Sequence, residues 1–218
     1  MARRSKSKTI ARRGLMLVLS SPSGAGKTTL SRMLLTTERN IELSISVTTR
    51  PKRKGEVNGR EYNFVSVAEF EAMRARNEFV ESALVHGNHY GTSHQWVGAR
   101  LAEGQDILLE IDWQGAAQVR RVQPEAVGIF ILPPSYQALL SRLNSRATDA
   151  PDVIAQRLKN AREEMTHLTD FDYVIINDDF DRTAQELAAI VVAERLTRTR
   201  QVARHRELVD QLLNPRLG

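Results

Sequence analysis

The feature that most constrains the fold is an apolar run that leads directly into a glycine-rich turn and then into a helical pattern. The run covers residues 15–20, the turn closes with Gly-Lys-Thr at residues 26–28, and apolar side chains at helical spacing follow. A strand, a loop and a helix in this order are the context that a phosphate-binding loop (P-loop) requires. Glycines let successive N–H groups point inward, and the helix N-terminus brings its positive end to the same place. The segment therefore predicts a nucleoside triphosphate site.

Two side chains complete this predicted site. Lys27 supplies a point charge for the outer phosphates, and the Thr28 hydroxyl can ligate Mg²⁺. Ser21 stands where the full pattern opens with glycine, and a small residue is tolerable there. The residues expected to contact ATP in this segment are Ser21, Pro22, Ser23, Gly24, Ala25, Gly26, Lys27, Thr28 and Thr29. The alternative, a strand–helix turn that binds no ligand, is disfavoured by the Gly-Lys-Thr triplet.

Composition excludes several classes of function. The longest apolar runs are only as long as strands, so no membrane partner is expected. The 218-residue chain has no cysteine, which excludes disulfides and thiolate metal sites. Its net charge is +5, but residues 1–13 hold six Lys or Arg and no acid, which leaves −1 for the rest. A near-neutral body argues against a nucleic-acid partner. We interpret residues 1–13 as a disordered basic leader and expect a cytoplasmic protein.

Short apolar runs alternate with helical patterns along the chain. The predicted strands are Leu15–Ser20, Ile107–Ile111, Val127–Leu132 and Tyr173–Asn177, and the predicted helices are Thr28–Thr37, Trp113–Val122, Tyr136–Leu143, Val153–Leu168 and Thr183–Leu213. Strands that are apolar at successive positions are typical of a parallel sheet buried on both faces, so the pattern predicts a doubly wound α/β fold. The helix at 183–213 is Arg-rich, but its apolar stripe favours packing against the core over nucleic-acid binding.

Two polar segments interrupt this alternation. Residues 47–92 are predicted to form an inserted domain, and residues 142–157 a basic flap. An inserted domain and a flap around a P-loop suggest phosphoryl transfer between nucleotides, because such enzymes close over both substrates to exclude water.

A second group of polar residues lies in the inserted segment. Arg50 and Arg53 stand in a turn before a glycine, and an arginine fork suits bidentate contact with a phosphate. Ordinary surface arginines are the alternative at these two positions. Further on, Glu81 offers two acceptor oxygens and no donor. Such a carboxylate matches the adjacent N1–H and amine of guanine, a pair of donors that adenine lacks.

The motifs together resemble the guanylate kinase family. They are residues 20–29, Ser-Val-Thr-Thr-Arg-Pro-Lys-Arg (46–53), Gly-Glu-Val-Asn-Gly (55–59), Tyr-Gly-Thr (90–92), Leu-Glu-Ile-Asp-Trp-Gln-Gly (109–115), Phe-Ile-Leu-Pro-Pro-Ser (130–135) and Val-Ile-Ile-Asn-Asp-Asp (174–179). They occur in the family's order from about residue 14 to 210. The resemblance implies a P-loop nucleoside monophosphate kinase fold and Mg²⁺-dependent transfer of the γ-phosphoryl of ATP to GMP, with dGMP as a further acceptor.

The resemblance also implies a division of the chain and a set of site residues. The core would cover 14–46, 93–135 and 166–218, the GMP-binding domain 47–92, and the lid region 136–165. The implied guanine-recognition residues are Ser46, Glu81 and Thr92, and those for the GMP phosphate are Arg50, Arg53, Tyr62 and Tyr90. The lid and hinge arginines are Arg142, Arg146 and Arg157, Asn177 lies near adenine, and Glu110 and Asp112 lie near GMP and Mg²⁺, with Asp112 acting on the metal through a water. Lys27, Arg50 and these three arginines are the expected catalytic set.

The chain departs from the family pattern in two places and leaves two alternatives open. Glu110 stands where many members have Asp, and Arg146-Ala147 replaces a common Arg-Gly pair. One alternative is a guanylate-kinase-like scaffold domain, which would typically lack the P-loop lysine that is present here. The other is a kinase for a different phosphate acceptor, such as a ribose bisphosphate. The partners expected are therefore ATP and GMP, and association into a homo-oligomer is left open.

Overall fold

The computed structural model describes residues 13–85, 87–144 and 151–215. Its centre is a parallel sheet in the order β2-β7-β1-β8-β9. The strands are β1 (Met16–Ser20), β2 (Ile41–Leu43), β7 (Asp106–Glu110), β8 (Val127–Leu132) and β9 (Tyr173–Ile176). Central β1 is buried along its whole length, with Met16 beside Ile107 and Leu17 beside Val127. The predicted α/β class with a parallel sheet is thereby confirmed, whereas the short edge strand β2 was not predicted.

Helices cover both faces of this sheet. α1 (Lys27–Thr37) and α7 (Phe180–Arg195) pack on one face, where Leu30 and Leu187 are buried against β1. α3 (His94–Ala102) and α4 (Trp113–Val122) pack on the other, where Val97 and Val119 are buried. Because β1, β7 and β8 are enclosed on both faces, they carry almost continuous apolar runs, whereas Val174 and Ile176 of β9 are exposed. Its carboxyl edge, where β1 ends and α1 begins, remains available for a ligand.

A second sheet stands beside this core, with strand order β4-β3-β6-β5. Its elements are β3 (Val47–Thr48), β4 (Asn63–Phe64), α2 (Val67–Ala75), β5 (Phe79–Val85) and β6 (Asn88–Ser93). Phe70 of α2 stacks on Phe79 with ring centroids 4.6 Å apart. Gln118 of α4 links this sheet to the core, because its amide exchanges hydrogen bonds of 3.0 and 3.1 Å with the backbone of Ser82. The division into a separate domain at 47–92 stays a prediction.

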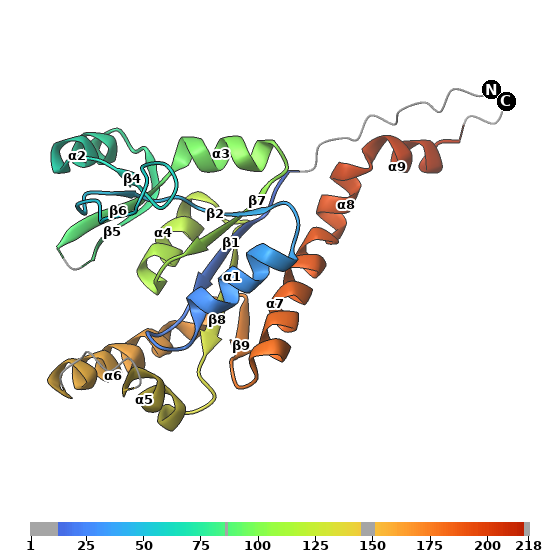
Figure 1. The fold of residues 1–218 in the computed structure, drawn as a ribbon. Helices are drawn as coiled ribbons and strands as arrows, with labels where there is room; N and C mark the ends of the chain where they lie inside the picture. Colours follow the sequence, from blue (N-terminus) through green and yellow to red (C-terminus); the bar gives the residue numbers. More distant parts are fainter. Residues whose placement is uncertain (1–12, 86, 145–150, 216–218) are drawn as a thin grey trace.

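A pair of helices lies at the other end of the molecule (Figure 1), beside the loop that precedes α1. They are α5 (Tyr136–Asn144) and α6 (Pro151–Thr166), followed by the short 3-10 helix η1 (His167–Asp170). Leu139, Leu143 and Ala161 form a small buried cluster between them. Arg146, which was predicted to act in this region, lies outside the described residues, as do residues 1–12 of the predicted leader.

The prediction of one long helix over 183–213 is wrong. The structure has α7, α8 (Arg198–Arg204) and α9 (Arg206–Leu213), and α8 and α9 lead away from the core (Figure 1). Thr197 has an extended backbone (φ −55°, ψ 144°). The side-chain amide of Gln201 donates a 2.9 Å hydrogen bond to the backbone carbonyl of Arg195, where α7 ends. The predicted apolar stripe therefore packs only along α7, and Leu196 and Leu208 are exposed. No helix among the described residues is long and apolar enough to cross a membrane.

Arg195 joins α7 to the core through charged contacts. Its Nε lies 2.8 Å from Oδ2 of the fully buried Asp106, and one Nη lies 2.6 Å from Glu38. We expect Arg195→Met to lower the free energy of unfolding by about 3 kcal/mol, because the change removes the partner of a buried charge. Urea unfolding measures the loss. Arg206→Met is the control, since exposed Arg206 lies 3.9 Å from its carboxylate partner. Equal effects of the two changes would contradict the prediction.

Candidate active site

The P-loop has the backbone geometry that a phosphate cradle needs. Gly24 and Gly26 have φ values of +91° and +100°, in the left-handed region that side chains rarely adopt. At Gly26 a Cβ would also lie 2.4 Å from Nδ2 of Asn177. Asn177 is buried, and its amide donates a 2.7 Å hydrogen bond to the carbonyl of Ala25. The structure therefore uses Asn177 to hold the loop, and its predicted place near adenine stays a prediction.

A pocket of about 310 Å³ opens over this loop. It is lined by Ser21, Pro22, Ser23, Gly24, Gly26, Lys27, Thr28, Thr29, Asp112 and Glu164. Every loop residue predicted to contact ATP lines it apart from Ala25, which is fully buried. Because backbone amides and the N-terminus of α1 face this pocket, its chemistry suits a polyphosphate.

Lys27 lies inside this pocket among carboxylates. Its Nζ donates a 3.3 Å hydrogen bond to the carbonyl of Ile111. Burial lowers the pKa of Lys27, while the nearby charges of Glu110, Asp112 and Glu164 oppose that shift. The ammonium is thus poorly solvated in the free protein, and its interaction with an entering phosphate is correspondingly strong.

A second pocket of about 310 Å³ lies between the core and the second sheet. Its lining residues are Thr28, Arg32, Leu35, Leu43, Ser44, Ser46, Glu61, Tyr62, Thr92, Leu109, Glu110 and Ile111. Thr28 lines both pockets, so they adjoin at the start of α1. The predicted site residues Ser46, Tyr62, Thr92 and Glu110 meet in this cavity, although they come from distant parts of the sequence.

Glu81 lies on β5 beside this second pocket. Its Oε1 accepts a 2.6 Å hydrogen bond from the hydroxyl of Thr92, and both side chains are buried. Burial raises the pKa of Glu81, the charge of Asp112 adds to the rise, and the Thr92 hydrogen bonds oppose it. A buried carboxylate with this limited set of partners suits two adjacent donors of a ligand.

Arg50 and the two predicted tyrosines also lie together. The Arg50 guanidinium sits 5.2 Å from the ring centroid of Tyr62, and the Tyr62 and Tyr90 rings are 5.8 Å apart. One Nη of Arg50 lies 2.7 Å from Oε1 of Glu56, whose other oxygen accepts a 2.7 Å hydrogen bond from the Arg53 amide. The Arg53 side chain is exposed rather than gathered with the others. Glu56 thus binds the Arg50 side chain and the Arg53 backbone, a role that the sequence did not predict.

Two of the predicted lid arginines contact the P-loop. The Arg142 guanidinium donates hydrogen bonds of 3.4 and 3.0 Å to the carbonyls of Ala25 and Asn177. The guanidinium of Arg157 donates to the hydroxyl of Ser23 at 2.9 Å. Both arginines therefore lie at the edge of the phosphate pocket, on α5 and α6.

The oxygen atoms at the start of α1 form a candidate place for Mg²⁺. The Thr28 hydroxyl donates a 3.1 Å hydrogen bond to one oxygen of Glu110, and Ser31 donates to the other. Asp112 caps α4 by accepting a 2.8 Å hydrogen bond from the amide of Gly115. A hydroxyl and carboxylates beside a phosphate pocket are the donors that Mg²⁺ prefers, so these residues fit the metal.

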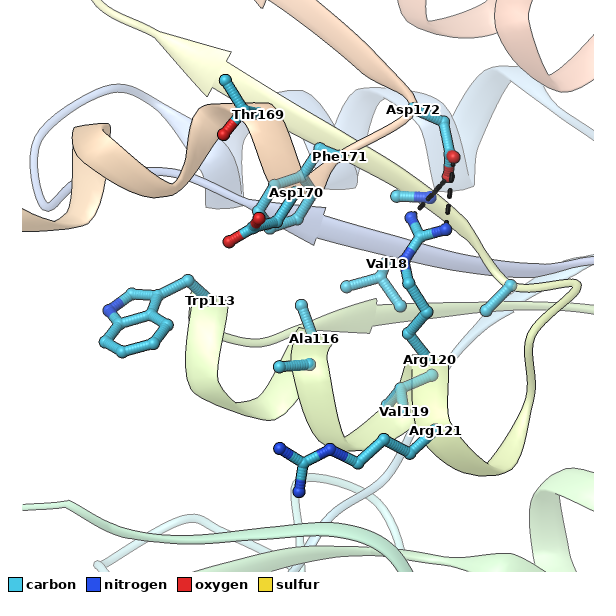
Figure 2. Close-up of a pocket in the computed structure, with 13 residues that line it drawn as sticks. Val18, Trp113, Ala116, Val119, Arg120, Arg121, Thr169, Asp170, Phe171 and Asp172 are labelled. Atoms are coloured by element: carbon cyan, nitrogen blue, oxygen red, sulfur yellow. Dashed lines mark hydrogen bonds and ion pairs between the residues drawn. The ribbon is translucent and has the colours of Figure 1, made fainter.

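Another cavity, of about 550 Å³, lies between α4 and η1 (Figure 2), away from these groups. Arg120 and Asp172 form an ion pair of 2.7 Å at its edge. Trp113 stacks on His167 with ring centroids 3.5 Å apart. This stacked contact gives Trp113 a packing role beside the cavity.

Comparison with known proteins decides the family. The guanylate kinase family model matches residues 13–194. A guanylate kinase of Dechloromonas aromatica is 56% identical over 200 residues, covering 92% of this chain and 99% of the relative. One from Nitrosomonas europaea is 53% identical, covering 90% and 98%. The chain belongs to the guanylate kinase family. The crystal structure of guanylate kinase from Anaplasma phagocytophilum covers 94% of this chain and 98% of its own, with 37% identity and a TM-score of 0.72.

Membership in the guanylate kinase family confirms the recognition made from the motifs and the P-loop nucleoside monophosphate kinase fold. The match extends over the P-loop, the second sheet and α6, and so includes the described parts of both pockets. Three residues of the site were not predicted. Arg32 and Glu164 line the pockets, and Glu56 pairs with Arg50. Glu56 and Arg32 lie within or near motifs that the sequence analysis had noticed, whereas nothing local distinguishes Glu164.

Proposed function

We propose that this chain transfers the γ-phosphoryl of ATP to GMP, and to dGMP, giving ADP and GDP. The family supports the reaction, because ATP:GMP phosphotransfer is what guanylate kinases catalyse. The observation that carries the proposal is the pair of adjoining pockets that share Thr28. One has the amide-rich wall of a polyphosphate site, and the other is lined by Thr92, which hydrogen-bonds the buried carboxylate of Glu81. Two nucleotides would therefore meet at the start of α1.

The first pocket is assigned to ATP. Residues 21–29 would surround its phosphates, and Asn177 would approach the adenine. Lys27, Arg142, Arg146 and Arg157 would face the transferred group. A loose phosphoryl-transfer transition state spreads its charge over peripheral oxygens, which is why cationic groups at the pocket edge suit it.

The second pocket is assigned to GMP. Glu81, Thr92 and Ser46 would recognise the guanine edge, with Glu81 accepting from the two adjacent donors. Arg50, Arg53, Tyr62 and Tyr90 would hold the phosphate. This assignment requires Arg50 to exchange its ion pair with Glu56 for one with the ligand, a replacement of one anion by another at the same guanidinium.

Catalysis would come from positioning and electrostatics. The attacking oxygen of GMP is already anionic, so no general base is required. Thr28, Glu110 and Asp112 would hold Mg²⁺, with Asp112 acting through a water, and the bound ion would offset phosphate charge. The chain's own residues would align the two nucleotides in line, while Lys27 and the arginines stabilise the charge on the moving group.

An acceptor screen tests the proposal. ADP release from MgATP is followed by a coupled assay with GMP, dGMP, AMP, UMP or CMP as acceptor. We expect release with the two guanine nucleotides and little with the other three, because only guanine matches Glu81. A folded protein that binds ATP but phosphorylates none of them would favour another acceptor. Failure to bind any nucleotide would favour the scaffold alternative.

A further inference from the structure

Glu164 is a carboxylate that contacts the P-loop from a distant part of the sequence. It belongs to α6, and its Oε2 accepts a 3.2 Å hydrogen bond from the backbone amide of Ser23 in the P-loop. It lines the phosphate pocket together with Lys27 and acts electrostatically on that ammonium. The carboxylate therefore makes the two interactions that a P-loop offers to an anionic oxygen, a backbone amide and a lysine charge.

The same helix holds Ser23 a second time. Arg157 lies two turns before Glu164 on α6 and donates to the Ser23 hydroxyl at 2.9 Å. One residue of the loop is thus fixed by a cation at its side chain and by an anion at its amide. These two contacts dock α6 against the P-loop in the nucleotide-free chain.

The charge of an entering polyphosphate attracts one of these two α6 side chains and repels the other. Arg157 can turn from a hydroxyl to a phosphate, which is a better acceptor for a guanidinium. Glu164 cannot, because a carboxylate next to phosphate oxygens is a pair of like charges in a poorly solvated pocket. Burial already raises the pKa of Glu164, so its charged form is disfavoured before the ligand arrives.

We propose that Glu164 is a built-in substitute for a phosphate oxygen, which occupies the P-loop in the free chain and must leave when ATP enters. Glu164 is then a determinant of ATP affinity: it competes with the ligand and keeps α6 docked while the site is empty. The inference rests on the proposed function only in taking this pocket as the one that receives the ATP phosphates.

The test compares Glu164→Gln with wild type and with Glu163→Gln. Glutamine keeps the size of the side chain and removes the charge. Glu163 is the matched control because it is the neighbouring carboxylate on α6 and is exposed. Isothermal titration calorimetry gives Kd for tripolyphosphate, which has no base or sugar, and for MgATP. We expect both ligands to bind about fivefold or more tightly to the Glu164→Gln variant and within twofold of wild type to the control.

Two further readouts separate this role from a structural one. Glu164→Ala should tighten tripolyphosphate binding as well, which keeps the test valid if one variant folds poorly. The KM for ATP should fall, whereas the KM for GMP should not, since Glu164 does not line the second pocket. Unchanged or weaker tripolyphosphate binding in folded Glu164 variants would overturn the inference. If wild type did not phosphorylate GMP while the Glu164 variants still bound tripolyphosphate more tightly than wild type, only the proposed reaction would be contradicted.

Discussion

Replacing Lys27 with alanine is expected to lower kcat/KM for GMP phosphorylation by about 10²- to 10³-fold. That loss corresponds to about 3 to 4 kcal/mol of transition-state stabilisation, the scale of one preorganised donor at developing charge. The ammonium lies inside the phosphate pocket and is held by the carbonyl of Ile111. Poor solvation makes its attraction to the transferred phosphoryl group larger than that of a surface lysine. A coupled assay over a range of MgATP and GMP concentrations measures the effect.

The stability of the Lys27→Ala variant separates a lost charge from a damaged fold. Burial lowers the pKa of Lys27, which means that the folded state disfavours its charged form. Below that lowered pKa the lysine therefore destabilises the free protein, and alanine should unfold at an equal or higher temperature. Lys159→Ala is the control, because Lys159 is exposed on α6. Near wild-type turnover in the Lys27→Ala variant would contradict the proposed role of Lys27 in stabilising the transferred phosphoryl group.

Local sequence order was sufficient to predict the P-loop and most of the core. A buried parallel strand followed by Gly-Lys-Thr has few structural alternatives, and β1, β7, β8 and β9 each carry a continuous apolar run. β2 was not predicted, because it has three residues and lies at the sheet edge, with only Ile41 buried. Periodicity cannot detect so short a strand.

The C-terminal region shows the opposite error, because a periodic pattern predicted one continuous helix where the structure has three shorter ones. Apolar residues continue at helical spacing beyond Arg195, but after that residue the chain has left the sheet. With no surface to pack against, the pattern does not require one straight helix, and the extended Thr197 divides it. Helix propensity is a weak prior where tertiary contact is missing.

Two of the site residues that were not predicted, Glu56 and Glu164, are carboxylates that contact the cations or backbone amides of the site. Glu164 reaches an amide 141 positions earlier in the chain, and no local pattern distinguishes it from Glu163 beside it. The sequence shows Glu56 only as part of a family motif, although in the structure it contacts both the Arg50 side chain and the Arg53 backbone. Glu56 and Glu164 share one physical cause. A phosphate site presents cations and backbone amides, and in the free chain its own carboxylates bind these groups. On the proposals made above, ligand binding would exchange these anions for phosphate.

Glu81→Gln is expected to reduce kcat/KM for GMP by about 100-fold. The carboxylate can accept from both donors of the guanine edge, and hydrogen bonds to a charged group contribute about 1.5 to 3 kcal/mol each. Glutamine offers one acceptor and turns an NH₂ group toward a donor, so one contact becomes unfavourable. Activity with AMP should not fall in parallel, because adenine lacks that pair of donors. The measurement is kcat/KM for both acceptors in wild type and variant.

The ionisation of Glu81 also predicts how the KM for GMP and the stability of the protein change with pH. Burial raises the pKa of Glu81, and only the ionised form can accept from both guanine donors. The KM for GMP in wild type should therefore rise as pH falls through that raised pKa, whereas the variant has no such titration. The sign for stability is opposite: above its raised pKa the buried charge destabilises the free protein, so Glu81→Gln should unfold at an equal or higher temperature.

A matched carboxylate shows whether position or charge matters. Glu78→Gln removes the same charge just before β5, where Glu78 pairs with exposed Arg76 outside both pockets. It should leave KM for GMP and its pH profile within about twofold of wild type, since a pair between exposed side chains contributes little. If Glu81→Gln kept full GMP activity, or if both variants lost it equally, guanine recognition could not rest on Glu81. A loss confined to Glu81, with stability retained, would place the base-reading contact at the one buried carboxylate of β5.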